Sequence, residues 1–323
     1  MIADTLNKDA SDIRLRLTVT PPPDRTRLIR TVTAVVIVGP VIGCIAAAAL
    51  AIRYGVSAAA IAGFIVAYVL TTLGVTLGYH RHFAHRSFRT SRAMQAIFIV
   101  LGASALQGSL LYWVSTHRRH HQFSDTADDP HSPHNRGGQS LGPFDGFWHG
   151  HIAWMFSRDV TNAMRFAPDI LRDPFVFALQ SRYGLWALIG LALPAAIGGL
   201  WSGTAYGALE MFLWSGPVRL LGVHHASWAV GSISHLYGRR PFATGDHSAN
   251  NFWVAVFAFG EGLQNNHHAF PRAARHAFRW WEPDLSGLVI AGLERARLIW
   301  DVNRPTPEQL TAARRDNTLA KPA

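Results

Sequence analysis

Apolar side chains are concentrated in four long runs that carry almost no charge. The runs cover residues 31–52, 56–77, 183–201 and 205–221. At a rise of about 1.5 Å per residue, helices of such lengths match a hydrocarbon core of about 30 Å. Only residues 53–55 and 202–204 separate the members of each pair. We therefore expect two tight helical hairpins and four membrane spans.

A fifth apolar stretch, residues 93–114, is also long enough to cross a membrane, but histidine clusters stand on both sides of it. A crossing would place those clusters on opposite faces of the bilayer. If the clusters act together, the stretch must be a helix that lies in the interface or is buried in protein. Gln95 and Gln107 within it favour this interpretation.

Charge predicts the orientation of the spans. Residues 1–30 carry Lys8, Arg14, Arg16, Arg25, Arg27 and Arg30, whereas the hairpin tips carry only Arg53. Because positive residues remain on the cytoplasmic side, we expect both termini and the histidine regions there. This divides the chain into a flexible arm (1–30), a membrane domain (31–300) and a loose tail (301–323). Glu210 lies inside the fourth run, and we expect it near the interface or protonated.

Composition supports a membrane protein. Hydrophobic residues make up 49% of the 323 residues and charged residues 15%, where soluble domains carry roughly 25% charged residues. The single Cys44 argues against a disulfide scaffold. The formal charge of +10 suits either nucleic acid or an anionic membrane surface. The apolar runs favour the membrane, and we expect no nucleic-acid partner.

The 17 histidines are clustered. The clusters read His80-Arg-His82-Phe-Ala-His85, His117-Arg-Arg-His120-His121 and Gln264-Asn-Asn-His267-His268, with His224, His225 and His235 between the last two. On a helix, the second cluster falls within an arc of about 100°, as metal ligands on one face do. A solvated basic face would explain one such cluster, but not three at one membrane surface. In the first cluster helical spacing pairs His82 with His85, while His80 and His85 lie about 140° apart, and both pairings stay open.

The number of imidazoles indicates two metal ions. Imidazole suits zinc, copper, iron and nickel, but a structural zinc favours cysteine. The chain contains no His-Glu-x-x-His, so a zinc protease is disfavoured. Eight or more imidazoles exceed one coordination sphere. A dinuclear redox centre beside a bilayer suits the activation of dioxygen against an unactivated C–H bond of a lipid, and iron fits this task best.

Together with the segments between them, these clusters resemble the membrane fatty acyl desaturases of the stearoyl-CoA (delta-9) type. The similarity covers most of residues 56–275. It includes Asp129-Pro-His131-Ser-Pro133, His225-Ala-Ser-Trp228, Gly231-Ser-Ile-Ser-His235-Leu-Tyr-Gly238, Asp246-His-Ser-Ala-Asn250-Asn251 and Gly260-Glu261-Gly262.

The resemblance implies an all-α membrane fold with a cytoplasmic helical cap that holds two irons. By position, the implied ligands are His80, His85, His117, His120, His121, His235, His267 and His268. The family's ninth histidine falls on Gln264, and an asparagine that acts through water falls on Gly231. Either Gln264 ligates through its carbonyl oxygen, or His225 or His131 fills the gap. His82 falls in the variable interior of its cluster, so the resemblance favours His80 with His85.

The resemblance also implies the reaction. A cis double bond, at delta-9, is introduced into a saturated acyl chain of an acyl-CoA or acyl-lipid, and dioxygen becomes two waters. Electrons come from a separate ferredoxin or flavin reductase. Arginines near the clusters either hold a CoA or phospholipid phosphate or attract anionic lipid: Arg86, Arg89, Arg92, Arg118 and Arg119. Tryptophans either line an acyl tunnel or anchor the protein at the interface: Trp113, Trp148, Trp154 and Trp228.

Two alternatives compete with this hypothesis. One is a diiron hydroxylase of lipids, alkanes or carotenoids on the same scaffold. The other is a non-catalytic membrane protein that binds or moves metal. The second would carry histidines within its spans, whereas these clusters lie outside the predicted spans, which counts against it.

Overall fold

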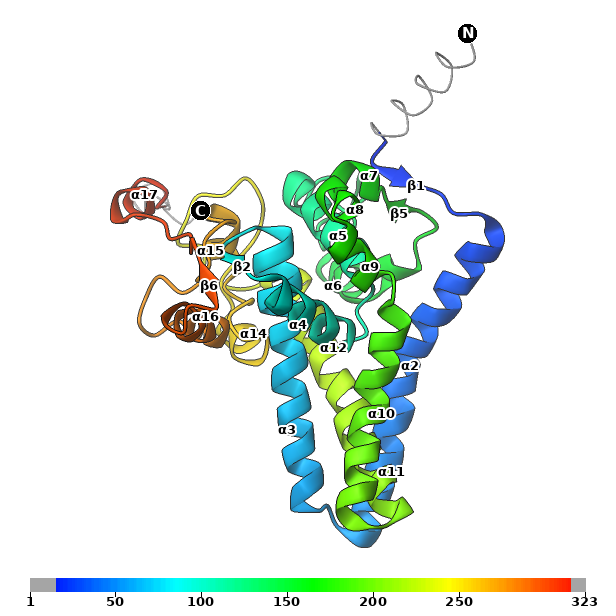
Figure 1. The fold of residues 1–323 in the computed structure, drawn as a ribbon. Helices are drawn as coiled ribbons and strands as arrows, with labels where there is room; N and C mark the ends of the chain where they lie inside the picture. Colours follow the sequence, from blue (N-terminus) through cyan, green and yellow to red (C-terminus); the bar gives the residue numbers. More distant parts are fainter. Residues whose placement is uncertain (1–15, 315–323) are drawn as a thin grey trace.

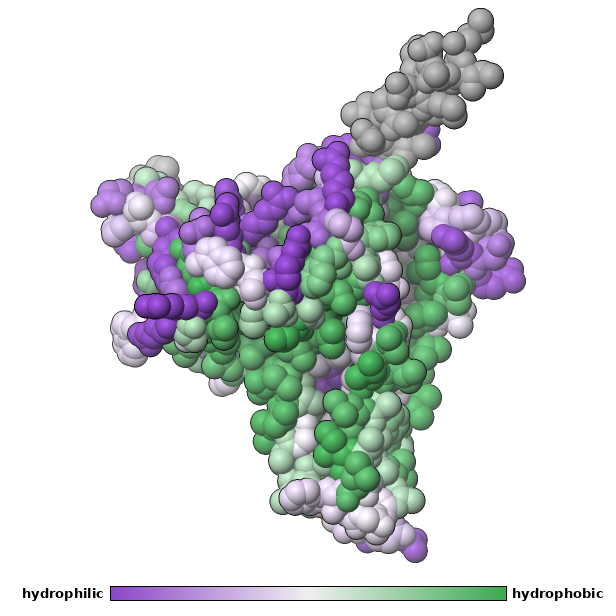
Figure 2. Space-filling model, viewed as in Figure 1, coloured by the Kyte–Doolittle hydropathy of each residue, from purple (hydrophilic) through white to green (hydrophobic). Residues whose placement is uncertain are grey.

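The computed structural model describes residues 16–314, which form a stalk of long helices and a cap of shorter ones (Figure 1). The stalk contains α2 (Pro23–Tyr54), α3 (Ala58–Leu73) with its π-helical continuation η1 (Gly74–Ala84), α10 (Tyr183–Ser202), α11 (Ala205–Leu213), η3 (Trp214–Val218) and α12 (Arg219–Gly231). Hydrophobic surface covers most of the stalk above its pale to purple lower tip, and hydrophilic surface gathers on the cap (Figure 2). The stalk is therefore the part suited to lipid.

The cap is built from short helices and three small strand pairs. Its helices are α4 (Arg92–Ala103), α5 (Leu110–Phe123), α6 (Pro143–His151), η2 (Ala153–Phe156), α7 (Ala163–Phe166), α8 (Pro168–Arg172), α9 (Pro174–Gln180), α13 (Ile233–Leu236), α14 (Phe252–Phe257), α15 (Gln264–Ala269), α16 (Leu285–Arg295) and α17 (Pro307–Ala312). The antiparallel pairs are β1 (Thr18–Val19) with β5 (Val160–Thr161), β2 (Arg89–Thr90) with β6 (Ile299–Trp300), and β3 (Asn135–Arg136) with β4 (Gln139–Ser140). The protein is thus mostly helical, as predicted.

Three helices in the described part of the chain are long and apolar enough to span a membrane: Pro23–Tyr54, Ala58–Ala84 and Tyr183–Ser202. The first and third contain the predicted runs 31–52 and 183–201, and the second begins at Ala58, two residues after the start of the predicted run 56–77. The fourth run is helical from Ala205 onward, but the π-helical turn η3, which contains Pro217, divides it. Proline lacks the N–H that a regular α-helix needs at this point. The four-span topology and its orientation therefore stay predictions.

Glu210 has a structural role at the tips of the two hairpins. Its Oε1 accepts a hydrogen bond from the Ser57 backbone N–H at 2.9 Å, and its Oε2 accepts one from Ser57 Oγ at 2.7 Å. Ser57 is in turn the N-cap of α3. The carboxylate of the second hairpin thus satisfies the first turn of a helix in the first hairpin.

The sequence suggested one helix over residues 93–114. The structure has two helices there, α4 and α5, with a break between them. Leu106 and Gly108 in the break have φ angles of 54° and 97°. The freed carbonyls of Ser104 and Ala105 accept hydrogen bonds from Arg219 and from the ring of His224, at 2.7 and 2.8 Å. Polar groups from α12 therefore compensate for the helical bonds that the break removes. Parts of both helices are buried in protein, as expected.

The two ends of the described chain are more structured than the sequence suggested. α2 begins at Pro23 rather than near residue 31, and β1 pairs with β5, so part of the expected arm belongs to the fold. In the expected tail, α17 is followed by a hydrogen bond from Ala243 N–H to Ala313 O at 3.1 Å. Residues 1–15 of the arm and 315–323 of the tail lie outside the described residues.

Candidate metal centre

Eight predicted ligand histidines meet in the cap as two neighbouring groups. The first group is His80, His85, His117, His121 and His267, and the second is His120, His235 and His268. Within each group, one ring nitrogen from every histidine lies within 4.8 Å of the others. The rings come from the end of η1, from α5, α13 and α15, which are distant in sequence. The fold therefore joins all three sequence clusters in one place.

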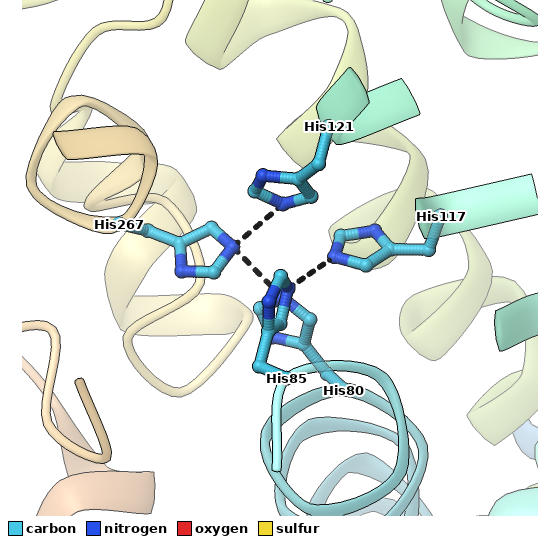
Figure 3. Close-up of side chains that lie close together, drawn as sticks. All are labelled: His80, His85, His117, His121 and His267. Carbon is cyan, nitrogen blue, oxygen red and sulfur yellow. Dashed lines mark hydrogen bonds between the residues drawn. The ribbon is translucent and has the colours of Figure 1, made fainter. Parts of the chain in front are cut away.

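In the first group the ring nitrogens point at one another rather than at separate partners (Figure 3). The Nε2 atoms lie 3.0 Å apart for His80 and His267, 2.7 Å for His85 and His117, and 2.9 Å for His121 and His267. Burial, followed by the neighbouring imidazoles, holds the pKa values of His117, His121 and His267 well below the usual range. These rings are therefore neutral, which is the form that binds a metal.

In the second group each histidine is held by its own carboxylate. Nδ1 lies 2.9 Å from Asp129 for His120, 2.9 Å from Asp125 for His235, and 2.5 Å from Asp246 for His268. The opposite nitrogen, Nε2, is buried and has no hydrogen-bond partner in any of the three rings. Carboxylates that orient imidazoles in this way are typical of metal sites. Three buried acceptors that lie within 4.8 Å of one another and have no hydrogen-bond partner fit the binding of a cation.

These carboxylates are ionised. Burial alone would raise the pKa of Asp129, but the His120 imidazole and backbone N–H groups outweigh it and lower that pKa to about 2. The pKa values of Asp125 and Asp246 are lowered further for the same reasons, by His235 and His268. An ionised carboxylate keeps the proton on Nδ1 and leaves Nε2 free to bind a metal.

Glu261 plays the same part in the first group, and a buried arginine holds it. His80 Nδ1 lies 2.5 Å from Glu261. The guanidinium of Arg81, which is fully buried, contacts Glu261 at 3.1 Å and Asp284 at 2.8 Å. The sequence analysis gave no role to Glu261, Arg81 or Asp284. Arg81 stands beside a histidine and Glu261 lies in the Gly260-Glu261-Gly262 segment, whereas Asp284 has no such signal.

The π-helical turn η1 decides which histidines of the first cluster meet. The backbone N–H of His85 bonds to the carbonyl of His80 at 3.1 Å, five residues earlier. This wider turn brings residues five apart toward one face, whereas an α-helix would place them about 140° apart. His82 points elsewhere, with Nδ1 3.2 Å from the Phe88 carbonyl and Nε2 3.2 Å from the Gln95 amide. Of the two pairings that helical spacing left open, the structure therefore brings together His80 and His85, the pair that the resemblance favours.

Three residues were candidates for a ninth ligand, and two of them, Gln264 and His131, line a cavity together with His120 of the second group. Gln264 is 2% exposed, and its Oε1 is buried without a partner. His131 stacks on His120 with ring centroids 4.4 Å apart, and its Nδ1 is also unpartnered. A side chain at Gly231 would begin 3.3 Å from that Nδ1. His225 is exposed and contacts His151 at 3.0 Å, so it belongs to neither group.

An apolar cavity of about 470 Å³ ends at the histidines. His80, His117, His120 and Gln264 form part of its wall, and it extends to Leu28 and Val32 of α2. Its volume is in the range of small-molecule sites, about 300–1,000 Å³. The cavity is suited to a flexible hydrocarbon chain, which would lie beside histidines of both imidazole groups.

The proposed substrate residues divide into two sets. Trp113, Trp154 and Trp228 line the apolar cavity, but Trp148 does not and is 52% exposed. The guanidinium of Arg118 is occupied by Asp169, at 2.7 Å, and by three backbone carbonyls. Neither Arg118 nor Arg86, Arg89, Arg92 or Arg119 lines this cavity.

A helical protein with an apolar stalk, two imidazole groups and an adjoining apolar cavity has the features of a membrane-associated metal oxidoreductase that acts on lipid chains. The comparisons give the family: the chain belongs to the fatty acid desaturases, whose family model matches residues 54–288. The resemblance in the sequence is thereby confirmed.

Three relatives show the range of the family around this chain. A hex-5-enoyl-[acyl-carrier protein] acetylenase of Moorena producens (strain JHB) is 40% identical over 84% of this chain and 86% of its own. A chloroplastic palmitoyl-monogalactosyldiacylglycerol delta-7 desaturase of Arabidopsis thaliana is 39% identical over 75% and 62%, respectively. An sn-1 stearoyl-lipid 9-desaturase of Anabaena variabilis is 38% identical over 73% and 81%.

Proposed function

We propose that this protein is an oxygen-dependent acyl desaturase that introduces a cis double bond, at delta-9, into a saturated acyl chain of a lipid or of CoA. The observation that carries the proposal is the pair of imidazole groups in the wall of an apolar cavity. A hydrocarbon chain in that cavity has its methylene groups beside the metal-binding nitrogens.

The donor set fits two iron ions. The first ion would be held by His80, His85, His117, His121 and His267, and the second by His120, His235, His268 and the carbonyl oxygen of Gln264. Neutral imidazoles with one amide and no thiolate suit iron. When bound, the two irons would supply the reduction of dioxygen to two waters, coupled to removal of two hydrogens from adjacent methylenes and to two external electrons.

The chain's own residues prepare the site for this chemistry. Asp125, Asp129, Asp246 and Glu261 hold Nδ1 of four histidines, so the orientation of these rings is set before any ion binds. The apolar walls exclude water and keep the acyl chain beside both groups. Trp113 stacks on the His117 ring with centroids 4.9 Å apart and forms part of the same wall.

We further propose that both termini and the metal centre lie on the cytoplasmic side of four spans. Arg25, Arg27 and Arg30 lie in the first turns of α2, at the end where the cap lies (Figure 1). The positive-inside rule favours the cytoplasm for that end. Tags at residues 54 and 203 should be reachable from outside, and a tag near residue 88 should not.

The test is expression in a host with a simple lipid set, followed by mass spectrometry that locates each new double bond. A new cis double bond in wild type, absent in His268→Ala, is the expected result. Hydroxylated products would assign the chain to the hydroxylases instead. Absence of any product, with a single zinc in the purified protein, would contradict the proposal. Offering a monounsaturated chain tests the acetylenic reaction that the Moorena relative's name describes.

A further inference from the structure

The short helix α14 is apolar on both of its faces. On the inner face Val254 and Ala255 are 7% and 0% exposed, and Val254 joins Ala229 in a buried apolar cluster. The outer face carries four exposed side chains, all of them apolar: Phe252, Trp253, Val256 and Phe257. A helix that is apolar all round belongs inside a protein or in lipid. Because the outer face of α14 is exposed, the protein itself does not cover it.

This exposed apolar surface continues onto residues 280–288. Trp280 is 96% exposed and Leu288 61%. The Ser286 backbone N–H donates a hydrogen bond to the Phe259 carbonyl at 3.0 Å, which joins the first turn of α16 to the end of α14. Exposed apolar patches of this kind mark interaction sites. We call the exposed apolar side chains of the two segments the aromatic face: Phe252, Trp253, Val256, Phe257, Trp280, Trp281, Leu285 and Leu288.

Contacts with the apolar helix α3 fix the depth of α14. The Tyr68 hydroxyl of α3 donates a hydrogen bond to the Phe257 carbonyl at 2.8 Å, and the Tyr68 ring meets Phe259 with centroids 5.9 Å apart. Tyr68 follows Ala58, where α3 begins, by ten residues, which is about 15 Å along a helix. The hydrocarbon core of a bilayer is about 30 Å thick. A bilayer that α3 spans from Ala58 therefore extends beyond Tyr68 and includes the attachment point of α14.

The arrangement of the elements agrees with this depth. Helices α14 and α16 lie along the lower edge of the cap, where the cap meets α3, whereas α17 lies at the opposite edge (Figure 1). Hydrophobic surface continues from the stalk onto this lower edge (Figure 2). The aromatic face is therefore an extension of the surface that the stalk presents to lipid.

Two arginines accompany the aromatic face at Trp281. The guanidinium carbons of Arg239 and Arg279 lie 5.9 and 5.8 Å from the centre of the Trp281 ring, and both arginines are exposed. Tryptophan is enriched at the level of lipid headgroups, where its ring meets both hydrocarbon and water. Arginine side chains at the same level extend toward the headgroups and keep their charge in water. The combination is typical of a protein surface at the boundary of a bilayer.

We propose that the aromatic face is a membrane anchor of the cap, which lies in the bilayer without crossing it. Helices of this kind bury their apolar face about 5–10 Å into the boundary between headgroups and acyl chains. Continuity with the stalk favours lipid over a second copy of the chain as the occupant of this face. The anchor also bears on the site, because Ala258 and Glu261, directly after α14, line the acyl cavity. It would hold that cavity at the level of the lipid chains.

The test measures the depth of single spin labels on the full chain in vesicles of phosphatidylcholine and phosphatidylglycerol. The only cysteine is first removed by Cys44→Ser. Labels are then attached to the aromatic face through Trp253→Cys and Leu288→Cys. Two controls use positions that are also exposed: Ile65→Cys on the apolar helix α3, and Ala312→Cys on α17 at the opposite edge of the cap (Figure 1). Exposed positions are chosen because a label there does not disturb the core.

Depth follows from the collisions of each label with oxygen, which concentrates in lipid, and with a water-soluble nickel chelate. For Trp253→Cys and Leu288→Cys the ratio of oxygen to nickel collisions should be several-fold higher than for Ala312→Cys and should approach that of Ile65→Cys. A ratio equal to that of Ala312→Cys would overturn the anchor. Low access of both probes would also overturn it, because protein would then cover the face, and spin–spin broadening would identify that protein as a second copy. The measurement needs no turnover, so it is independent of the proposed reaction.

Discussion

Replacement of Gln264 by leucine separates metal binding by this side chain from its packing. Leucine is close to glutamine in size but offers no oxygen. In the structure the Gln264 Oε1 is buried without a partner, and Gln264 lies on α15 four residues before His268 of the second group. The same atom therefore destabilises the metal-free protein and stabilises the metal-bound one.

The two effects have opposite signs. A buried acceptor left unpaired costs about 1–3 kcal/mol. Gln264→Leu should therefore raise the free energy of unfolding of the metal-free protein by an amount of that order. In the loaded protein a ligand is lost, and even outer-shell changes weaken metal binding about 10–100-fold. The affinity for the second iron should fall at least that much, about 1.4–2.8 kcal/mol.

The assay measures iron per chain, turnover, and thermal denaturation with and without chelator, for wild type, Gln264→Leu and Gln264→Ala. Both variants should lose most activity and bind about one iron, and the metal-free leucine variant should melt later than wild type. Gln264→His should retain part of the activity, because imidazole reaches a similar point. His225→Ala is the control, since that ring contacts His151 outside both groups.

Two irons and normal turnover in Gln264→Leu would refute a ligand role for Gln264. A complete loss of the second iron in His131→Ala would then assign the ninth position to His131, whose Nδ1 is also unpartnered. Earlier melting of the metal-free leucine variant would refute the claim that the amide oxygen is unsatisfied in the folded protein.

The remaining predictions follow from the same geometry. Purified protein should contain about two irons per chain and little zinc by elemental analysis, and removal of the metal by chelator should abolish desaturation until iron returns. A single tightly held zinc would contradict the proposed diiron centre. His268→Ala should abolish activity while the protein still reaches the membrane, whereas His82→Ala should retain both irons, because that ring faces Phe88 and Gln95; equal iron loss in the two variants would argue against this division. Asp246→Asn should weaken iron binding about 10–100-fold, because the carboxylate that orients His268 is lost, and unchanged iron content would refute its role. Glu210→Ala should lower thermal stability by about 1 kcal/mol with iron content unchanged, because the Ser57 end of α3 loses its carboxylate acceptor; a thermal shift no larger than that of an exposed control would contradict this.

The apolar runs and the histidine clusters were sufficient to predict the stalk and the kind of site. A long uncharged run has few stable arrangements in or out of lipid, so the helices that contain residues 31–52 and 183–201 follow from composition alone. Eight imidazoles beside such runs have little other use than to bind metals. Local sequence therefore determined the class of protein.

The sorting of the histidines was decided only by the tertiary structure. His117 and His121 lie four residues apart on α5 and face η1, while His120, on the same helix, turns to α13 and joins His235. An arc of about 100° places three rings near one another, but the helices packed on either side decide which histidine group each ring joins. The π-helical turn at His80 had no signal in the residue pattern.

The partners of the site also depend on tertiary contacts. Asp125 contacts His235, 110 residues away in sequence, and Asp246 contacts His268, 22 residues away. Sequence spacing does not predict contacts of this kind. The break at Ser104 exists because Arg219 and His224, from a distant helix, replace the hydrogen bonds that one continuous helix would have made. Sequence by itself determined which chemistry this protein carries. Only packing decided which atoms face one another, because the energy of a buried polar group depends on its neighbours in space.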